Sequence, residues 1–208
     1  MKKVFLTGSS SGIGAEFKQH LLASGFDITA PLRSELDLSA FDIDSVNLSS
    51  YDYLILCAGI DTNGRQPFVN LSTADFVNTV NVNLIANMKL IHQYVKQRQG
   101  WGKIIVLGST IVDKVYPNFV AYGTSKVALD VFVDSLAQEL RKTEIGLCTI
   151  HPGLVKTDFH YNRGNVPEQD RNILYDTLPH LITSELIPTL DQIVDDRQHA
   201  IKKVVVSR

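Results

Sequence analysis

Residues 4–14 carry the clearest structural signal in the chain and read Val4-Phe5-Leu6-Thr7-Gly8-Ser9-Ser10-Ser11-Gly12-Ile13-Gly14. The first part is an apolar run typical of a buried strand, and apolar side chains then recur at helical spacing from Gly14 to Ser24, where Gly25 ends the pattern. The sequence therefore predicts a strand, a glycine loop and a helix in that order. Backbone N–H groups and the helix dipole at such a helix start can hold a pyrophosphate. This order favours a dinucleotide-binding loop over a turn with a structural role alone.

The glycines and serines of this loop have separate expected roles. Gly8 makes the turn, Gly12 lets a phosphate approach the backbone, and Gly14 lets the helix pack closely on the strand. The hydroxyls of Ser10 and Ser11 can add contacts to the phosphates. A lone glycine triplet is weak evidence, but here the expected strand and helix flank it. The candidate phosphate-binding residues are Gly8, Ser10, Ser11, Gly12, Ile13 and Gly14.

Short apolar runs recur along the chain, with longer helix-patterned stretches between most of them. The runs are Val4–Thr7, Asp27–Pro31, Tyr53–Ala58, Lys103–Leu107, Ile145–Ile150 and Lys203–Val206. This alternation predicts an α/β fold, a doubly wound parallel sheet with helices on both faces. Only about twenty residues separate the second run from the third, too few for the usual helix and strand. We therefore expect a sheet trimmed by one βα unit after its second strand.

Composition and charge exclude several classes of protein. With 44% hydrophobic residues among 208, the chain can bury one core, so a single domain over residues 1–208 is expected. The net charge of −2 comes from scattered charges, which argues against a nucleic-acid partner. The apolar run Val4–Leu6 is too short for a signal peptide or a membrane span, so we expect a cytoplasmic protein. Cys57 and Cys148 lie in apolar runs without metal-ligand spacing, which predicts buried free thiols and no metal site.

Three motifs together resemble the short-chain dehydrogenase/reductase family. They are TGxxxGIG at residues 7–14, Ala58-Gly59 after a mid-chain strand, and Tyr122-Gly123-Thr124-Ser125-Lys126. The likeness covers roughly residues 1–160, and its specificity lies in the order and spacing of the motifs. It implies a Rossmann-like fold and hydride transfer between a nicotinamide cofactor and a carbonyl or secondary alcohol. The short segment after Arg33 and the C-terminal part of the chain match poorly.

Tyr122 and Lys126 are the leading candidates for acid/base chemistry. They are four residues apart in a stretch expected to be helical, so their side chains share one face. An ammonium group beside a phenol favours the charged form of the phenol and makes proton exchange at neutral pH practicable. The resemblance further implies that Tyr122 is the general acid/base and that Lys126 binds the nicotinamide ribose.

Two further catalytic candidates come from the resemblance. Ser109 follows a strand at a spacing before Tyr122 similar to that of the family's catalytic serine, which implies a hydrogen bond to the substrate oxygen; Thr110 is the local alternative. Asn83 is similar to the family's helical asparagine, which holds a water in the proton relay to the lysine, and Asn81 is the alternative.

The segment after the second strand bears on the choice of cofactor. NAD-dependent members of the family carry an acid where this chain has Leu32, and Arg33 can pair with a 2′-phosphate, so NADP(H) is favoured over NAD(H). Asp37 and Leu38 resemble the pair that flanks the adenine ring. Pro152-Gly153-Leu154-Val155-Lys156-Thr157 resembles the segment that holds the nicotinamide carboxamide. The further cofactor-binding candidates are thus Arg33, Asp37, Leu38, Ala58, Gly59, Pro152, Gly153, Val155 and Thr157, with Tyr122 and Lys126.

The substrate is expected to be a small carbonyl or alcohol compound covered by a segment at about residues 155–185. Candidate residues near it are Phe159, His160, Tyr161, Tyr175 and His180, with Ile60, Asp61, Ile111 and Tyr116. These side-chain types identify no molecule. The outer faces of the predicted helices 72–96 and 120–142 are candidates for the interface of a homodimer or a larger homo-oligomer.

Two other functions remain as alternatives. One is an NADP(H)-binding sensor or scaffold without catalysis, against which the set of Ser109, Tyr122 and Lys126 argues. The other is a sugar-nucleotide reductase or epimerase, for which the chain after Thr157 is short. His151 with Ser109 could suggest a hydrolase, but no GxSxG turn surrounds the serine.

Overall fold

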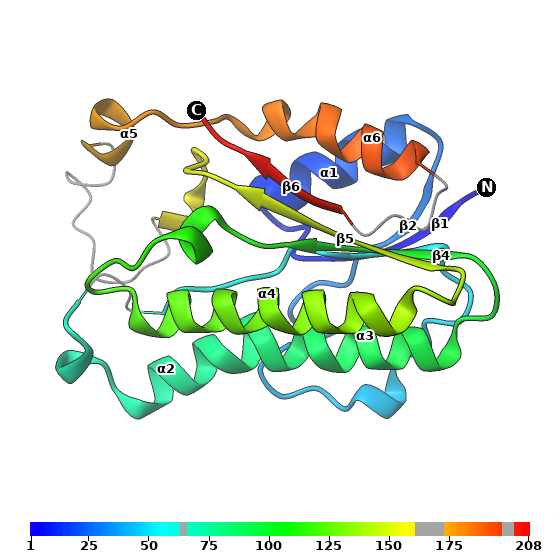
Figure 1. Cartoon of the computed structure of the whole chain (residues 1–208), viewed down its shortest axis with the longest axis horizontal. Coiled ribbons are helices and arrows are strands. Elements are labelled where there is room, and N and C mark those ends of the chain that lie inside the picture. Colours follow the sequence, from blue (N-terminus) through cyan, green and yellow to red (C-terminus); the bar gives the residue numbers. More distant parts are fainter. Residues whose placement is uncertain (63–65, 161–172, 197–201) are drawn as a thin grey trace.

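The fold is seen in a computed structural model that describes residues 1–62, 66–160, 173–196 and 202–208 (Figure 1). Within these residues, a six-stranded sheet has the order β2-β1-β3-β4-β5-β6, and every neighbouring pair of strands is parallel. The strands are β1 (Lys3–Thr7), β2 (Asp27–Thr29), β3 (Tyr53–Leu56), β4 (Gly102–Leu107), β5 (Ile145–Pro152) and β6 (Lys202–Val206). The predicted doubly wound α/β fold is confirmed.

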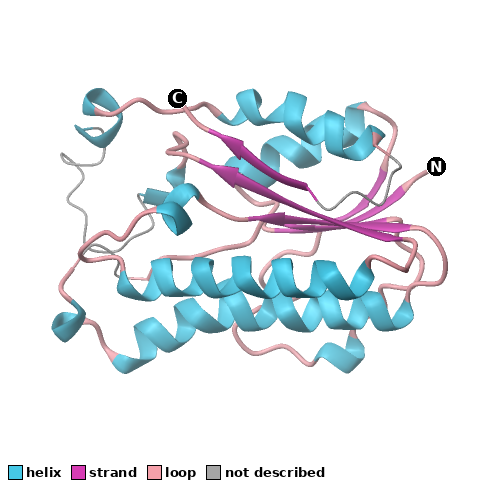
Figure 2. Cartoon of the chain, viewed as in Figure 1, coloured by secondary structure: helices cyan, strands magenta, loops and turns pink. Residues whose placement is uncertain are grey.

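Helices cover both faces of the sheet (Figure 2). The helices are α1 (Gly12–Ala23), α2 (Thr73–Val80), α3 (Ala86–Gln97), α4 (Val120–Leu140), α5 (Ile173–Thr177) and α6 (Ile187–Asp195). Phe17 of α1 and Leu190 of α6 pack into one buried cluster with the strands, whereas Leu90 of α3 and Leu129 of α4 pack into another. The sheet is therefore buried between two apolar layers, as its apolar strands require. Among the helices that the structure describes, none combines the length and the hydrophobicity that a bilayer crossing demands.

The sheet is trimmed where the sequence predicts. Between β2 and β3 the chain forms turns and one 3₁₀ turn at Ile43–Ser45. Leu48 in this segment is fully buried, and Leu38, Phe41 and Val46 pack against the same cluster as α3. Side chains of a loop thus cover the sheet where a helix would otherwise lie, and β2 remains as the edge strand.

The long helical stretch predicted over residues 72–96 is divided in the structure. The side chain of Ser72 caps α2 by accepting a hydrogen bond from the N–H of Asp75 at 3.1 Å. A π-helical turn at Asn81–Ile85 then separates α2 from α3. Such turns occur mostly as single insertions in α-helices and often at functional sites. The second predicted helix, 120–142, corresponds to α4.

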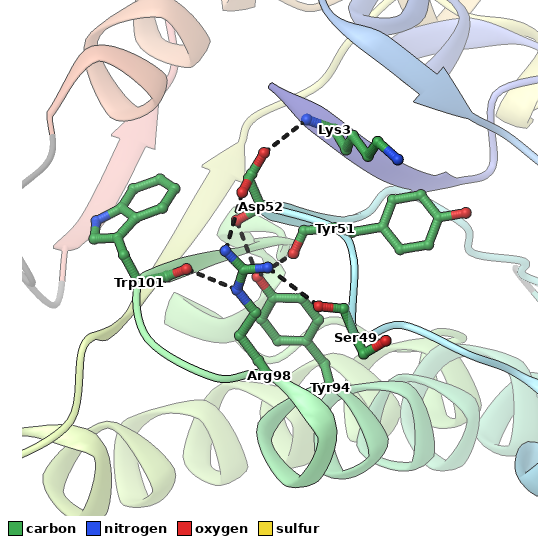
Figure 3. A network of polar contacts seen from close by, with 7 residues as sticks. All are labelled: Lys3, Ser49, Tyr51, Asp52, Tyr94, Arg98 and Trp101. Atoms are coloured by element: carbon green, nitrogen blue, oxygen red, sulfur yellow. Dashed lines mark hydrogen bonds and ion pairs between the residues drawn. The ribbon is translucent and has the colours of Figure 1, made fainter. Parts of the chain in front are cut away.

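A polar network connects the N-terminal ends of three strands to the end of helix α3 (Figure 3). The guanidinium of Arg98 donates to the carbonyl oxygens of Trp101 at 2.7 Å and Ser49 at 3.2 Å, and it pairs with the carboxylate of Asp52 at 3.0 Å. Asp52 also accepts from the N–H of Lys3 at 2.8 Å. The end of α3 is thereby joined to the starts of β1, β3 and β4. The C-terminal ends of the strands, on the opposite side, remain available for a binding site.

Candidate functional site

The carboxyl ends of the strands open onto a cavity of about 1050 Å³. The chain crosses the sheet in opposite directions from β1, to β2 on one side and to β3 on the other, and ligands bind such sheets at this switch point. The cavity is lined by residues 7–14, 31–33, 36–38, 57–62, 107–111 and 152–155. Further side chains come from α2, the π-helical turn, the segment before α4, α4 itself and the chain that follows β5. The loops after β1, β3, β4 and β5 therefore share one space.

The glycine loop has the backbone geometry of a close-packed turn. Gly8 has a φ of +73°, and a Cβ at this position would lie 2.5 Å from the backbone nitrogen of Ala58. A Cβ at Gly14 would lie 2.1 Å from the carbonyl oxygen of Gly8, so only glycine allows α1 to start this close to β1. Gly12 faces the side chain of Thr157, because a Cβ built on Gly12 would lie 3.3 Å from the Cβ of Thr157. The loop thus contacts the segments after both β3 and β5.

The start of α1 leaves backbone donors available to the cavity. Ser11 is the N-cap of α1, but its side chain makes no capping hydrogen bond. Ser10, Ser11 and Ile13 line the cavity beside the glycines. A helix start without a side-chain cap has free N–H groups and the positive end of the helix dipole, which together attract an anionic group.

Tyr122 and Lys126 line the cavity from α4, as their spacing predicts. The ammonium nitrogen of Lys126 lies 5.9 Å from the centre of the Tyr122 ring. Lys126 is 5% exposed and donates to the carbonyl oxygen of Leu107 at 2.8 Å. Burial lowers the pKa of Lys126 to about 8, because desolvation disfavours the charged amine. An amine whose pKa is lowered by burial therefore lies near the phenol.

Cys57 occupies a position close to this lysine. The side chain lines the cavity, and burial raises the pKa of its thiol to about 12. The thiol is therefore neutral under ordinary conditions and acts as a small apolar group.

Ser109 lies directly after β4 and also lines the cavity. Its hydroxyl accepts a hydrogen bond from the N–H of Ile111 at 3.2 Å, which leaves the hydroxyl proton free to be donated elsewhere. Thr110, the alternative, begins the following 3₁₀ turn and lines the cavity as well. The imidazole of His151 faces the main-chain carbonyl of Ser109 at 3.0 Å, so the two residues do not form the hydroxyl–imidazole pair of a hydrolase.

Asn83 lies behind the wall of the cavity. It is fully buried in the π-helical turn, where its amide accepts from the N–H of Ile60 and donates to the carbonyl of Ile60, both at 2.8 Å. A Cβ at Gly59 would lie 3.4 Å from Asn83 Oδ1 and 3.8 Å from Lys126 Nζ, so both side chains converge behind Gly59. Asn81 instead lines a separate cavity of about 110 Å³.

Ser125 joins these groups and was not predicted as a site residue. Its hydroxyl donates to the carbonyl oxygen of Tyr122 at 2.7 Å and accepts from the Asn83 amide at 3.1 Å. It is fully buried, and it fixes the π-helical turn against the first turns of α4. The signal was present as the polar residue directly before Lys126, on a helix whose other buried positions are mostly apolar.

Arg33 and Asp37 form one end of the cavity together with Leu38. The two charged side chains approach each other at 3.6 Å and are 78% and 46% exposed. Ser39 donates two hydrogen bonds to Asp37, at 2.9 and 2.7 Å, and these bonds lower the pKa of the Asp37 carboxyl. Arg33 is thus a solvated cation at the mouth of the cavity, with a carboxylate as neighbour.

The segment after β5 forms another wall through Pro152, Gly153, Val155 and Thr157. It is fastened by Tyr175 of α5, which is 4% exposed. The Tyr175 hydroxyl lies 3.3 Å from the carbonyl oxygen of Val155, 3.1 Å from that of Thr157 and 3.3 Å from the Thr157 nitrogen. Tyr175 does not itself line the cavity, but its hydroxyl contacts the backbone of the loop that does.

The remaining candidates for substrate contact are only partly brought together. Phe159, His160, Ile60, Asp61, Ile111 and Tyr116 line the cavity, and the ring of Phe159 lies 5.6 Å from that of Tyr122. His180 is not part of the lining; its ring contacts Tyr175 at 5.3 Å. Tyr161 lies outside the described residues. Sequence reasoning missed Phe119, Leu174 and Leu178, which also line this end.

Comparisons with known proteins agree with this arrangement. The family model for short chain dehydrogenase matches residues 40–166. This range begins after the glycine loop, so the match to the family does not depend on the loop motif at residues 7–14. L-xylulose reductase from Caenorhabditis elegans is 26% identical over 206 residues, covering 86% of this chain and 81% of the relative.

Solved structures share the fold. A small-chain dehydrogenase in complex with NADPH has a TM-score of 0.84 at 20% identity and covers 99% of this chain and 96% of its own. 4-Hydroxyisoleucine dehydrogenase complexed with NADH has a TM-score of 0.78 at 22% identity, with coverages of 100% and 97%.

Proposed function

The chain belongs to the short chain dehydrogenase family, and from this premise we propose that it is an NADP(H)-preferring oxidoreductase that interconverts a carbonyl and a secondary alcohol. The observation that carries the proposal is the convergence of Tyr122, Lys126 and Ser109 on one cavity that also contains the glycine loop. A protein that only bound the cofactor would need no proton donor in that position.

The cavity fits a dinucleotide. The uncapped start of α1 supplies donors for a pyrophosphate, and the backbone contacts of Gly8 and Gly14 keep this surface free of side chains. Asp37 and Leu38 would hold the adenine at one end, and the segment from Pro152 to Thr157 would hold the nicotinamide. When bound, the nicotinamide supplies or accepts the hydride.

The residues of the chain handle the proton. Tyr122 donates a proton to the carbonyl oxygen during reduction and takes it back during oxidation. The hydroxyl of Ser109 donates a hydrogen bond to the same oxygen and stabilises the negative charge that develops there. The Lys126 ammonium, buried near the Tyr122 ring, favours the ionised phenol. Asn83 and Ser125 hold α4 and the π-helical turn in register behind these groups.

Replacement of the phenol tests this assignment. In Tyr122→Phe the proton donor is lost but the ring remains, so we expect kcat to fall by about 100-fold or more while NADPH binding is kept. The assay is NADPH oxidation with a panel of ketones and aldehydes, and binding is measured by nicotinamide fluorescence. Near-normal turnover of this variant would refute the role of Tyr122.

The preference for NADP(H) rests on Arg33. Its guanidinium can pair with a 2′-phosphate at the mouth of the cavity, and Leu32 offers no carboxylate to the ribose. The similar structures hold NADPH in one case and NADH in another, so they support either cofactor. We expect NADPH to bind more tightly than NADH, and Arg33→Ala to weaken NADPH binding by about tenfold while leaving NADH binding unchanged. Equal losses for both cofactors would contradict a 2′-phosphate contact.

A further inference from the structure

Asn87 is a buried amide in the first turn of α3, directly after the π-helical turn. It is 3% exposed, and its amide nitrogen donates to the carbonyl oxygens of Val82 at 3.3 Å and Asn83 at 2.8 Å. Both acceptors belong to the π-helical turn. Because carbonyl oxygens only accept hydrogen bonds, the nitrogen of the amide, and not its oxygen, faces the main chain. The side chain is therefore committed to the turn, and it does not line the large cavity.

The geometry of a π-helical turn creates the need for such a donor. The N–H of Ala86 binds the carbonyl of Asn81, five residues earlier, instead of the carbonyl four residues earlier as in an α-helix. Each N–H serves one carbonyl, so a helix that returns to the four-residue spacing skips one carbonyl oxygen. The skipped oxygen follows the carbonyl of Asn81, and Asn87 donates to the next two carbonyls of the chain. The amide thus supplies the hydrogen bond that the main chain omits.

The π-helical turn sets the direction of the Asn83 side chain. The Asn83 amide accepts from the N–H of Ile60 and donates to the carbonyl of Ile60, both at 2.8 Å, and it donates to the hydroxyl of Ser125 at 3.1 Å. Ile60 lies in the loop after β3 that lines the cavity, and Ser125 directly precedes Lys126 in α4. If these residues wound as a regular α-helix, the Asn83 side chain would point in another direction relative to α3. The three bonds therefore depend on the form of the turn.

The bonds of Asn83 lie next to the candidate catalytic side chains. A Cβ at Gly59 would lie 3.4 Å from Asn83 Oδ1 and 3.8 Å from Lys126 Nζ, so the loop after β3 packs closely on both groups. Ser125, which accepts from Asn83, also donates to the carbonyl of Tyr122 at 2.7 Å. A displaced Asn83 would leave this loop and the first turns of α4 without their shared hydrogen-bond partner.

We propose that Asn87 is a positioning residue for the active site: its amide stabilises the π-helical turn, and the turn holds Asn83 against the loop after β3 and against α4. This inference rests on the proposed function of Tyr122 and Lys126. Asn87 lies outside the cavity, so it acts on the reaction through Asn83. Its loss should lower kcat, whereas NADPH binding, which depends on the glycine loop and Arg33, should change little.

Two substitutions of equal shape test the hydrogen bond itself. In a helix, a threonine hydroxyl can bond the carbonyl four residues earlier, which for position 87 is that of Asn83. Asn87→Thr therefore keeps the shorter of the two bonds, whereas Asn87→Val has the same shape without a donor. We expect kcat to stay within about threefold of the wild type in Asn87→Thr and to fall by about 10- to 100-fold in Asn87→Val. The dissociation constant for NADPH should stay within about threefold in both variants. Equal kcat in the two variants would overturn the proposal.

Hydrogen exchange measured by mass spectrometry tests the positioning without any assay of activity. In Asn87→Val, peptides that cover residues 57–62 and 81–86 should exchange faster than in the wild type, because the N–H of Ile60 loses its fixed acceptor. Asn87→Thr should exchange as the wild type does. Unchanged exchange of both segments in Asn87→Val would refute the role of Asn87. If the wild type binds no NADPH and reduces no carbonyl, the proposed function fails, and the exchange data still decide whether Asn87 holds the turn.

Gln93 offers a matched control on the same helix. It is 7% exposed, and its amide donates to the carbonyl oxygens of Ile43 at 3.3 Å and Val46 at 3.2 Å, in the segment between β2 and β3. Gln93→Leu likewise removes two bonds from a buried amide to main-chain carbonyls, but at residues that do not line the cavity. It should lower stability in urea unfolding and keep kcat within about twofold. A loss of kcat as large as that of Asn87→Val would show that general loosening of the fold is the cause, against the proposal.

A second pair of substitutions covers the case in which circular dichroism shows that Asn87→Val does not fold. Asn87→Ser keeps a hydroxyl that can bond the carbonyl four residues earlier, and Asn87→Ala has no donor but the best helix propensity. The same difference in kcat and in hydrogen exchange is expected between these two variants. Its absence would overturn the proposal.

Discussion

Lys126 is a cation whose charge the folded protein tolerates poorly. Burial lowers its pKa from 10.5 to about 8, whereas the unfolded chain keeps the proton to higher pH. Between about pH 8 and 10.5 the unfolded state therefore binds more protons, and the free energy of unfolding of the cofactor-free protein rises with pH in this window. The strain of the buried charge is relieved as the amine becomes neutral.

This linkage predicts a measurable difference from Lys126→Met. The stability of the wild type relative to this variant should increase by roughly 3 kcal/mol from about pH 7.5 to pH 10.5, because other titrating groups cancel in the comparison. Urea unfolding at several pH values measures it. A difference that stays constant across the window would mean that the amine is not desolvated in the folded state.

At the level of single residues, the sequence predicted best where one helix or one loop sets the geometry. Tyr122 and Lys126 share a face because they lie four residues apart on α4, and the glycines act within one turn. Ser125 was missed because its partner Asn83 is 42 residues away in the chain. Tyr175 was assigned to the segment that covers the substrate because the sequence shows only that the residue is aromatic. Its contacts with Val155 and Thr157 become visible only in the structure.

Among the elements, α5 has a role that its length of five residues does not suggest. Through the Tyr175 hydroxyl it fixes the loop after β5, the segment proposed to hold the nicotinamide. Tyr175→Phe removes these hydrogen bonds and leaves the ring in place. We expect the dissociation constant for NADPH to rise by about 3- to 10-fold, the equivalent of one buried hydrogen bond.

The control for this variant is Tyr51→Phe, whose hydroxyl binds Thr29 at 2.9 Å outside the cavity. It should leave NADPH binding unchanged in the same fluorescence titration. If both variants bind NADPH as the wild type does, the loop is held by its contacts with Leu181 and does not depend on Tyr175.

The apolar pattern predicted the six strands, α1, the stretch that contains α2 and α3, and α4, but it did not predict α5 or α6. Two further features of the elements did not follow from the apolar pattern either. The trimmed connection between β2 and β3 was predicted because residue counts limit what fits there. The π-helical turn at Asn81–Ile85 was not predicted, because it occupies only five residues between two helical stretches. The boundary between α2 and α3 depends instead on the buried bonds of Asn83 to Ile60.

For the whole molecule, α4 presents an apolar stripe to solvent. Val120, Val127 and Val131 are 46%, 43% and 60% exposed, and their spacing places them along one side of the helix. Single exposed valines are common, but a row of them on one helix is typical of an interface. We expect the protein to form a homodimer in which this face of α4 meets a second copy.

Val131→Asp tests the interface because it puts a charge into the stripe. The variant should be monomeric in analytical ultracentrifugation and retain its fold by circular dichroism, whereas Val69→Asp, at a valine that is 87% exposed outside α4, should remain dimeric. A monomeric wild type would show that this face has no partner copy.

The short β2 at the border of the sheet has a consequence for solubility. An edge strand offers unpaired backbone groups to any other extended chain, and long apolar edges are common starting points of aggregation. Here the edge is three residues long and begins with the exposed Asp27. A sheet shortened by one βα unit thus ends in a strand that offers little template for pairing, and concentrated protein should resist aggregation along this border.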